Sequence, residues 1–112
     1  ISAAAISDFA PERHEGKIPS GSPLTVRLNP LPKVIDEVKA ACSPTVVAFK
    51  LGWDEEGRAR AMLEEGARMV VVNAPPTMGA KEGSFRLMTA DGTRDVAGSK
   101  EEVARAIWSG LL

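Results

Sequence analysis

The stretch that decides the fold is TVVAFKLGWDEEGRARAMLEEGARMVVVN, residues 45–73. Residues 45–51 form a continuous run rich in β-branched side chains, which is typical of a central strand in a parallel sheet. A helix is predicted next, with Asp54 as its N-cap and Gly66 just past its C-terminus. Its buried stripe consists of Ala59, Met62 and Leu63. Residues 69–73 are a second apolar strand, so the stretch predicts a βαβ unit with parallel strands.

On the N-terminal side, residues 1–7 (ISAAAIS) form a short apolar run without charge. We interpret it as another strand buried on both faces. Open α/β sheets bind ligands at the carboxyl ends of their strands, and Asp8 follows where this strand should end. The small alanines would let a flat ligand approach the backbone. Residues 10–22 read as a flap that brings Lys17 over that edge; a buried strand followed by an ordinary surface loop is the alternative.

Between these two regions, residues 24–29 alternate apolar and polar side chains, which predicts a half-exposed edge strand. A helix is expected to start near Pro32, a residue that suits the first helical turn. Its apolar stripe has five members: Val34, Ile35, Val38, Ala41 and Cys42. Within that stripe, we interpret Cys42 as a small buried hydrophobe rather than as a reactive thiol.

On the C-terminal side, residues 84–90 alternate as a strand, and Asp91-Gly92 is a strong hairpin signal. Ser99 and Glu102 have the spacing of a capping box, and the helix that follows has an apolar line of Val103, Ile107 and Leu111. We expect the hairpin and the 24–29 strand to be additions outside the parallel sheet. The predicted fold class is therefore α/β, a Rossmann-like parallel sheet with flanking helices plus an added β-hairpin and edge strands.

Composition limits the function classes. The chain has 112 residues with 14 Lys and Arg against 15 Asp and Glu, a net charge of −1. This balance argues against nucleic acid or a membrane surface as partner, since both favour a basic protein. One cysteine leaves no internal disulfide and fits a cytoplasmic location. Because residue 1 is an isoleucine that leads directly into a predicted strand, we expect the domain to be incomplete and preceded by further sequence.

Few motifs in the sequence indicate a binding or catalytic site by themselves. The sequence contains neither of the glycine-rich phosphate loops, GxGxxG and GxxxxGK[ST], and no set of metal-ligand spacings. His14, the single histidine, is interpreted as a solvated loop residue. Lys17 offers a point charge for phosphate. Phe49, near the exposed end of a strand, could stack on a base, although a plain core position is the alternative.

Taken together, several segments resemble phosphopantothenoylcysteine synthetase, a coenzyme A enzyme often fused to a flavin-dependent decarboxylase. The resemblance is carried, in order along the chain, by SAAAISDF (2–9), GKI (16–18), LTV (24–26), PKVI (32–35), VAF (47–49), VVVN (70–73) and SKEEVA (99–104). It identifies residues 1–112 as the C-terminal part of a single synthetase-like domain, with the flap at about residues 10–22.

The resemblance implies a carboxylate–amine ligase. Such an enzyme activates the carboxylate of 4′-phosphopantothenate with CTP or ATP, accompanied by Mg²⁺, and the amine of cysteine then displaces the nucleotide. Lys17 would be the catalytic flap lysine that reaches the phosphates. The residues expected to bind the nucleotide are Ser2, Ala3, Ala4, Asp8, Lys17, Pro32, Lys33, Val34, Ile35 and Phe49, with no metal ligand among them. The family is a homodimer in which flap and outer strands help to build the neighbour's site.

Departures from the family pattern leave two hypotheses. The family's Gly-Gly-Thr turn and catalytic asparagine precede this segment, so the chain would hold at most half of a site and be inactive alone. The helix after Phe49 carries two nucleotide-contacting lysines in bacterial relatives, but Ala61 and Glu65 occupy the nearest positions here. The chain is therefore a ligase fragment or, alternatively, a non-catalytic dimerisation or interaction subunit that kept the fold.

Overall fold

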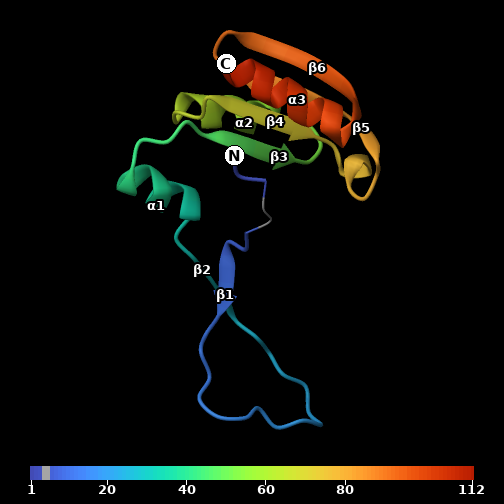
Figure 1. Ribbon diagram of the computed structural model, residues 1–112. Coiled ribbons are helices and arrows are strands. Elements are labelled where there is room, and N and C mark those ends of the chain that lie inside the picture. The colour runs from blue at the N-terminus through green and yellow to red at the C-terminus, as the bar shows by residue number, and fades with distance from the viewer. Residues whose placement is uncertain (4–5) are drawn as a thin grey trace. The chain divides into compact units, whose positions relative to one another are not determined.

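The computed structural model describes residues 1–3 and 6–112, and the chain divides into two compact units (Figure 1). The sheet unit comprises Ile1–Ala3 and Thr45–Leu112, and the second unit comprises Ala4–Pro44. The elements in chain order are β1 (Phe9–Pro11), β2 (Leu28–Pro30), α1 (Val34–Ala41), β3 (Val47–Leu51), α2 (Glu56–Glu64), β4 (Met69–Asn73), the 3₁₀ turn η1 (Pro75–Thr77), β5 (Glu82–Thr89), β6 (Gly92–Ser99) and α3 (Lys100–Leu111).

The sheet unit confirms the α/β class and the βαβ unit over residues 45–73. Its sheet has the order β3-β4-β5-β6, in which β3 and β4 are parallel and the other two pairs are antiparallel. The expectation that the hairpin lies outside the sheet is wrong, because β5 pairs directly with β4. The hairpin thus makes the sheet mixed, since a two-residue connection can join only antiparallel strands.

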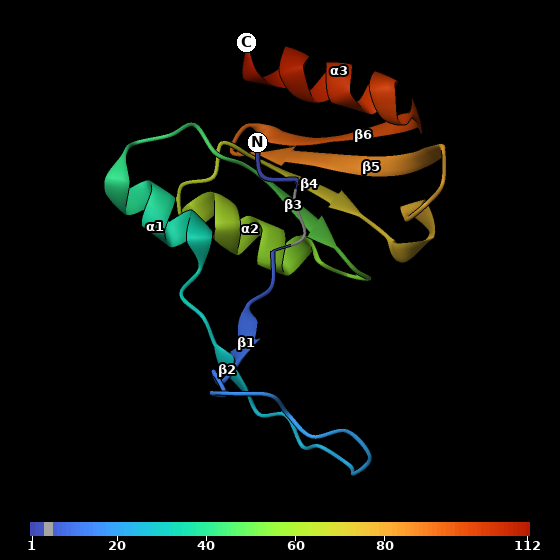
Figure 2. The same ribbon diagram turned by 60° about the horizontal axis from the view of Figure 1, so that its bottom comes forward.

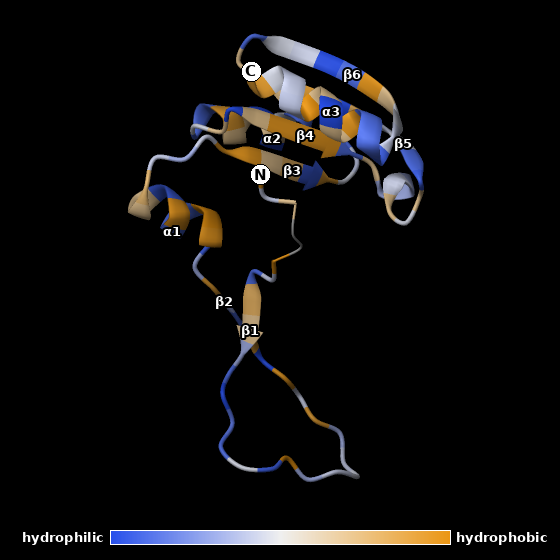
Figure 3. Cartoon of the chain, viewed as in Figure 1, coloured by the Kyte–Doolittle hydropathy of each residue, from blue (hydrophilic) through white to orange (hydrophobic). Residues whose placement is uncertain are grey.

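Two helices cover opposite sides of this sheet, as Figure 2 shows for α2 and α3. On the α3 side, the buried core consists of Val47, Met69, Val71, Phe85, Leu87, Val103 and Ile107. On the α2 side, a smaller core consists of Ala59, Val70 and Met88. Successive residues of a strand point to opposite faces, so β4, apolar along most of its length, serves both cores (Figure 3).

Helix α2 ends as predicted but begins differently. Gly66 has φ 101°, and the amides of Gly66 and Ala67 donate to the carbonyls of Leu63 and Met62, both at 3.0 Å. This is the Schellman motif, which favours glycine at that position. Asp54, predicted as the N-cap, instead has φ 55° in the preceding turn, and the N-cap is Glu55, whose side chain makes no capping hydrogen bond.

Helix α3 and the hairpin confirm their local signals. The Ser99 amide donates to Glu102 Oε2 at 2.8 Å, and the Glu102 amide donates to Ser99 Oγ at 3.3 Å, which completes the capping box. Strand β6 begins at Gly92 and runs to Ser99, where α3 is capped. Local hydrogen-bond chemistry decides these features, so short sequence motifs predict them well.

The predicted buried strand over residues 1–7 is wrong for the described part of that segment. Ser2 makes an isolated parallel bridge to Ala48, and Ile1 and Ile6 remain 57% and 53% exposed. Ala4 and Ala5 lie outside the described residues. An apolar run becomes a buried strand only where other strands and helices cover it, and alanine adds little strand propensity of its own.

In the second unit, β1 and β2 form a two-stranded antiparallel sheet, and residues 12–27 between them have no regular structure. The strand expected over 24–29 is thus shorter and shifted, at Leu28–Pro30. Helix α1 forms as predicted, but none of its residues is buried, although Figure 3 shows apolar patches along it. Cys42, expected to be buried, is exposed, and its thiol donates to the Val38 carbonyl at 3.3 Å.

Candidate functional site

The carboxyl edge of the two parallel strands lies where β3 and β4 end. The Ser2 amide donates to the Val47 carbonyl at 3.0 Å, so the first residues of the chain lie beside β3, parallel to it. Gly52, just past β3, donates to the Asn73 carbonyl at the end of β4, also at 3.0 Å. The structure therefore brings the predicted nucleotide-binding Ser2, with its neighbour Ala3, to the strand that carries Phe49. Ala4, predicted with them, lies outside the described residues.

Phe49 lies on the α3 side of β3. Its ring is half-buried and packs against the α3-side core. It also lines a cavity of about 300 Å³ at the carboxyl edge, together with Asn73, Thr77, Met78, Phe85, Lys100, Val103, Ala104 and Ile107. Within this cavity Asn73 Nδ2 donates to Thr77 Oγ1 at 2.6 Å. Phe49 thus packs against the core and also forms part of the cavity wall, and its stacking on a base stays a prediction.

On the α2 side of the same edge lies a cluster of two cations around one carboxylate. Lys50 Nζ and Arg58 Nη1 each lie 3.8 Å from Glu55 Oε2. The Glu55 side chain is 15% exposed, and among the described residues Oε2 has no hydrogen-bond donor. Sequence reasoning noted Arg58 only as a residue near Ala61 and Glu65, and it did not single out Lys50 or Glu55. The available signal was a lysine inside the otherwise apolar run of residues 45–51.

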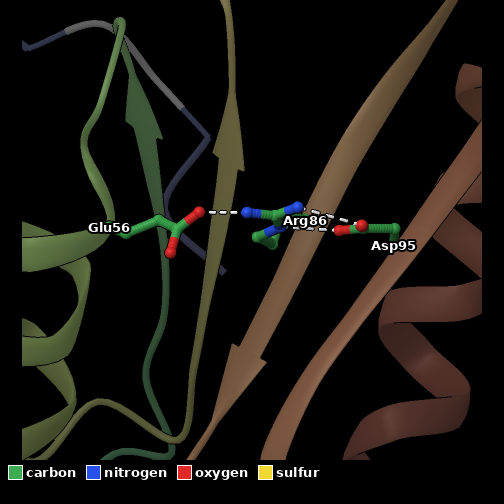
Figure 4. A network of polar contacts seen from close by, with 3 residues as sticks. All are labelled: Glu56, Arg86 and Asp95. Atoms are coloured by element: carbon green, nitrogen blue, oxygen red, sulfur yellow. Dashed lines mark hydrogen bonds and ion pairs between the residues drawn. The ribbon is translucent and has the colours of Figure 1, made fainter.

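Further along the same side, Arg86 of β5 joins two carboxylates from different elements (Figure 4). Its Nε and Nη2 donate to Asp95 Oδ1 and Oδ2 at 2.7 and 3.0 Å, and Nη1 pairs with Glu56 at the start of α2. The hydrogen bonds from Arg86 lower the pKa of Asp95, and the pKa of Arg86 is raised by both acids. Arg86 is also among the residues that line a second hollow, of about 410 Å³.

The remaining candidates belong to the second unit. The amide of Leu31 donates to the Asp8 carbonyl at 2.8 Å, and β1 pairs with β2 immediately beyond, so the structure brings Asp8 to the start of the 32–35 segment. There, Lys33 is the N-cap of α1, Pro32 precedes it, and Val34 and Ile35 open the helix. Lys17 is an exposed residue of the 12–27 loop.

Two features are absent from the described residues. Within 1–3 and 6–112, no group of three or more His, Cys, Asp and Glu side chains is placed to hold a metal ion. In the same residues, no helix has the length and apolar content needed to cross a membrane.

Comparison with known proteins gives concordant results. Residues 1–112 match the family described as "DNA/pantothenate metabolism flavoprotein C-terminal domain". The chain is 36% identical over 118 residues to the coenzyme A biosynthesis bifunctional protein CoaBC of Thermococcus kodakarensis, and 31% identical over 116 residues to that of Methanocaldococcus jannaschii. Each match covers 96% of this chain, which spans 29% of the length of either relative.

The fold is also found in a solved structure. The crystal structure of the DNA/pantothenate metabolism flavoprotein from Streptococcus pneumoniae is similar to this chain with a TM-score of 0.73 and 19% sequence identity. The similarity covers 96% of this chain and 59% of that one. Together with the sequence match over every residue, this shows that the chain belongs to the family of the DNA/pantothenate metabolism flavoprotein C-terminal domain.

Proposed function

We propose that the chain is the C-terminal part of a coenzyme A biosynthesis ligase that joins 4′-phosphopantothenate to cysteine. The observation that carries the proposal is the family match over residues 1–112, with relatives above 30% identity named as coenzyme A biosynthesis proteins. The placement of Ser2 beside β3, a parallel strand whose carboxyl end belongs to the edge where α/β sheets bind ligands, supports it.

The proposed reaction has two steps. The carboxylate of 4′-phosphopantothenate attacks the α-phosphorus of CTP or ATP and releases pyrophosphate, which gives an acyl-nucleotide. The amine of cysteine then attacks the acyl carbon and expels the nucleoside monophosphate, which forms the amide. The protein's contribution to such a reaction is to position the reactants and to neutralise the phosphate charge.

Lys17 is the cation that we assign to the phosphates from the 12–27 loop, and Mg²⁺ is expected to arrive bound to the triphosphate. Mg²⁺ usually keeps several waters and is held by substrate phosphates and one or two carboxylates, so it does not require a dedicated protein cage. A cytoplasmic location belongs to the same proposal.

We further propose that the protein acts as a homodimer. The second unit exposes several large apolar side chains, among them Leu24, Val26 and Leu28, each more than half exposed. Clustered exposed apolar residues are typical of a surface that another molecule covers. A second copy of the chain is the partner that the family resemblance implies.

The test uses the protein as encoded, with any sequence that precedes Ile1. Calorimetric titration with CTP and with ATP should show binding, and mass spectrometry should detect amide product and pyrophosphate. Lys17→Ala should lower kcat/KM by about 10²–10³-fold, as for other removed charge-stabilising groups. Arg13→Ala removes the same charge from the same loop and is the matched control. Residues 1–112 alone should bind nucleotide weakly or not at all.

Two results would contradict the proposal. If the encoded protein binds neither nucleotide, the ligase assignment fails, and the non-catalytic interaction subunit is the function to pursue. If Lys17→Ala and Arg13→Ala behave alike, Lys17 has no special role at the phosphates.

A further inference from the structure

A row of charged side chains crosses the sheet on its α2 side. The strand register pairs Lys50 with Val72, Val72 with Arg86, and Arg86 with Asp95. Paired residues on adjacent strands point to the same face. Val72 packs against the α2-side core, so its neighbours in the row also project from that side.

The ion pairs at the two ends of this row differ in their numbers of cations and carboxylates. At the β3 end, Lys50 and Arg58 share the single carboxylate of Glu55. Toward β6, the single guanidinium of Arg86 is shared by Glu56 and Asp95 (Figure 4). In these ion pairs Arg86 has two carboxylate partners, whereas Lys50 and Arg58 have one between them. Asp54, which precedes Glu55, adds a carboxylate to the turn, so it is the two cations, not a net positive charge, that the β3 end offers to an anionic ligand.

The geometry leaves the Lys50 ammonium able to bind a ligand. Its 3.8 Å separation from Glu55 Oε2 is longer than a hydrogen bond, and an ammonium has three donors. The Lys50 side chain is 31% exposed, so the ammonium can be reached from solvent. Glu55 is held close to the turn, because a Cβ on Gly52 would lie 2.6 Å from Glu55 Oε1. The Glu55 carboxylate thus orients the Lys50 ammonium but does not use all three of its hydrogen-bond donors.

Lys50 also lies at the proposed nucleotide-binding edge. It follows Ala48, the residue bridged to Ser2, by two positions toward the carboxyl end of β3, a distance of roughly 6–7 Å along the strand. Both residues point to the α2 side. The Lys50 ammonium is therefore near the segment assigned to the nucleotide.

We propose that Lys50 is a phosphate-binding residue, oriented by Glu55 and supported by Arg58, that contacts the triphosphate of the nucleotide from the sheet unit. This inference rests on the proposed ligase function. It gives the sheet unit a cation of its own for the phosphates.

The test compares nucleotide binding by variants of the protein as encoded, using calorimetry with CTP and with ATP in Mg²⁺ buffer. Lys50→Met should raise Kd by about 10- to 100-fold, the usual cost of losing a hydrogen bond to a charged group. It should also reduce the dependence of Kd on salt concentration, since one screened charge is lost. Lys81→Met, which removes an exposed lysine before β5, is the matched control and should leave Kd unchanged.

Two further variants separate a binding role from a structural one. Lys50→Arg keeps the charge and should restore most of the binding that Lys50→Met loses. Glu55→Gln removes the competing negative charge and should tighten binding; if it weakens binding as much as Lys50→Met does, the cluster is a structural ion pair and the inference fails. Thermal unfolding of each variant identifies any loss of folded protein.

The outcomes distinguish this inference from the proposed function. If the unaltered protein binds neither nucleotide, both fail. If it binds and Lys17→Ala weakens binding while Lys50→Met matches Lys81→Met, the ligase proposal stands and the role of Lys50 is refuted.

Discussion

The two units of the chain differ in whether their apolar residues are buried or exposed. In the sheet unit, Met69 and Val71 of β4 are 1% and 0% exposed, because β4 has a strand on each side and contributes to a core on each face. In the second unit, Leu24 remains 59% exposed, and none of its described residues is buried. Burial depends on how many neighbours an element has, not on how apolar its sequence is. The sheet unit therefore contains the buried core of the chain, whereas the second unit leaves its described apolar side chains at least partly exposed.

The largest effect on stability is expected for Met69→Ala in the sheet unit. Met69 is fully buried, so the substitution should lower the free energy of unfolding by about 2–5 kcal/mol through lost burial and the cavity left behind. Denaturant titration of the encoded protein measures the effect. A loss below about 1 kcal/mol would mean that this core is not the main source of stability.

A smaller effect is expected at the helix cap. Ser99→Ala removes the side chain that accepts from the Glu102 amide, and should lower the free energy of unfolding by about 1 kcal/mol. Ser99→Asp, which keeps an acceptor for that amide, is the matched control and should retain more of the stability. Equal losses in both variants would show that the cap contributes little.

Acid should destabilise the sheet unit through two carboxylates. Arg86 lowers the pKa of Asp95, and the hydrogen bonds from Ser99 lower the pKa of Glu102. Their stabilising contributions are present above the unfolded-state values of about 4 and are lost as the pH falls through the lower folded values. Because both groups are exposed, the effect should be smaller than that of Ser99→Ala. Asp95→Asn should weaken the dependence of the free energy of unfolding on pH between pH 5 and pH 2, as measured by denaturant titration. An unchanged pH profile would contradict the lowered pKa of Asp95.

The smallest effect is expected for Leu24→Ser in the second unit. Leu24 is mostly exposed, so the free energy of unfolding should change by less than about 0.5 kcal/mol in dilute protein. The same variant should weaken self-association, measured by sedimentation, if this surface binds a second copy. A loss of stability comparable to that of Met69→Ala would remove the distinction between the units.

Local signals account for what could be predicted. The β-branched runs before and after α2, the glycine at its C-terminus and the Ser99–Glu102 box all formed as expected. The hairpin signalled by Asp91-Gly92 also formed, with Ala90 and Asp91 as its two connecting residues. Each depends on backbone preferences or hydrogen bonds within a few residues. Three wrong predictions, burial of residues 1–7, burial of Cys42 and a hairpin outside the sheet, concern which distant segments pair or cover one another. The N-cap predicted at Asp54 was wrong for a local reason, because Asp54 lies in the turn before the helix.

The candidate site likewise contains residues that the sequence indicated and contacts that only the fold creates. Lys17, Asp8 and the 32–35 segment were singled out by resemblance, and their assigned roles stay predictions. The hydrogen bond between Asp8 and Leu31 could not be predicted, because it depends on the pairing of β1 with β2. The charge row through Lys50 and Arg86 was equally hidden, since it exists only once the register of four strands is set.

The sequence by itself determined the α/β class, the order of the strands and helices from α1 onward, and the family. Apolar periodicity and capping chemistry are local, and the motifs that resemble the family are read directly from the chain. Only the tertiary structure decided which strands neighbour one another, which faces the helices cover, and where charges collect on the α2 side. Those features arise from contacts between residues far apart in the chain, and no local pattern encodes which of them meet.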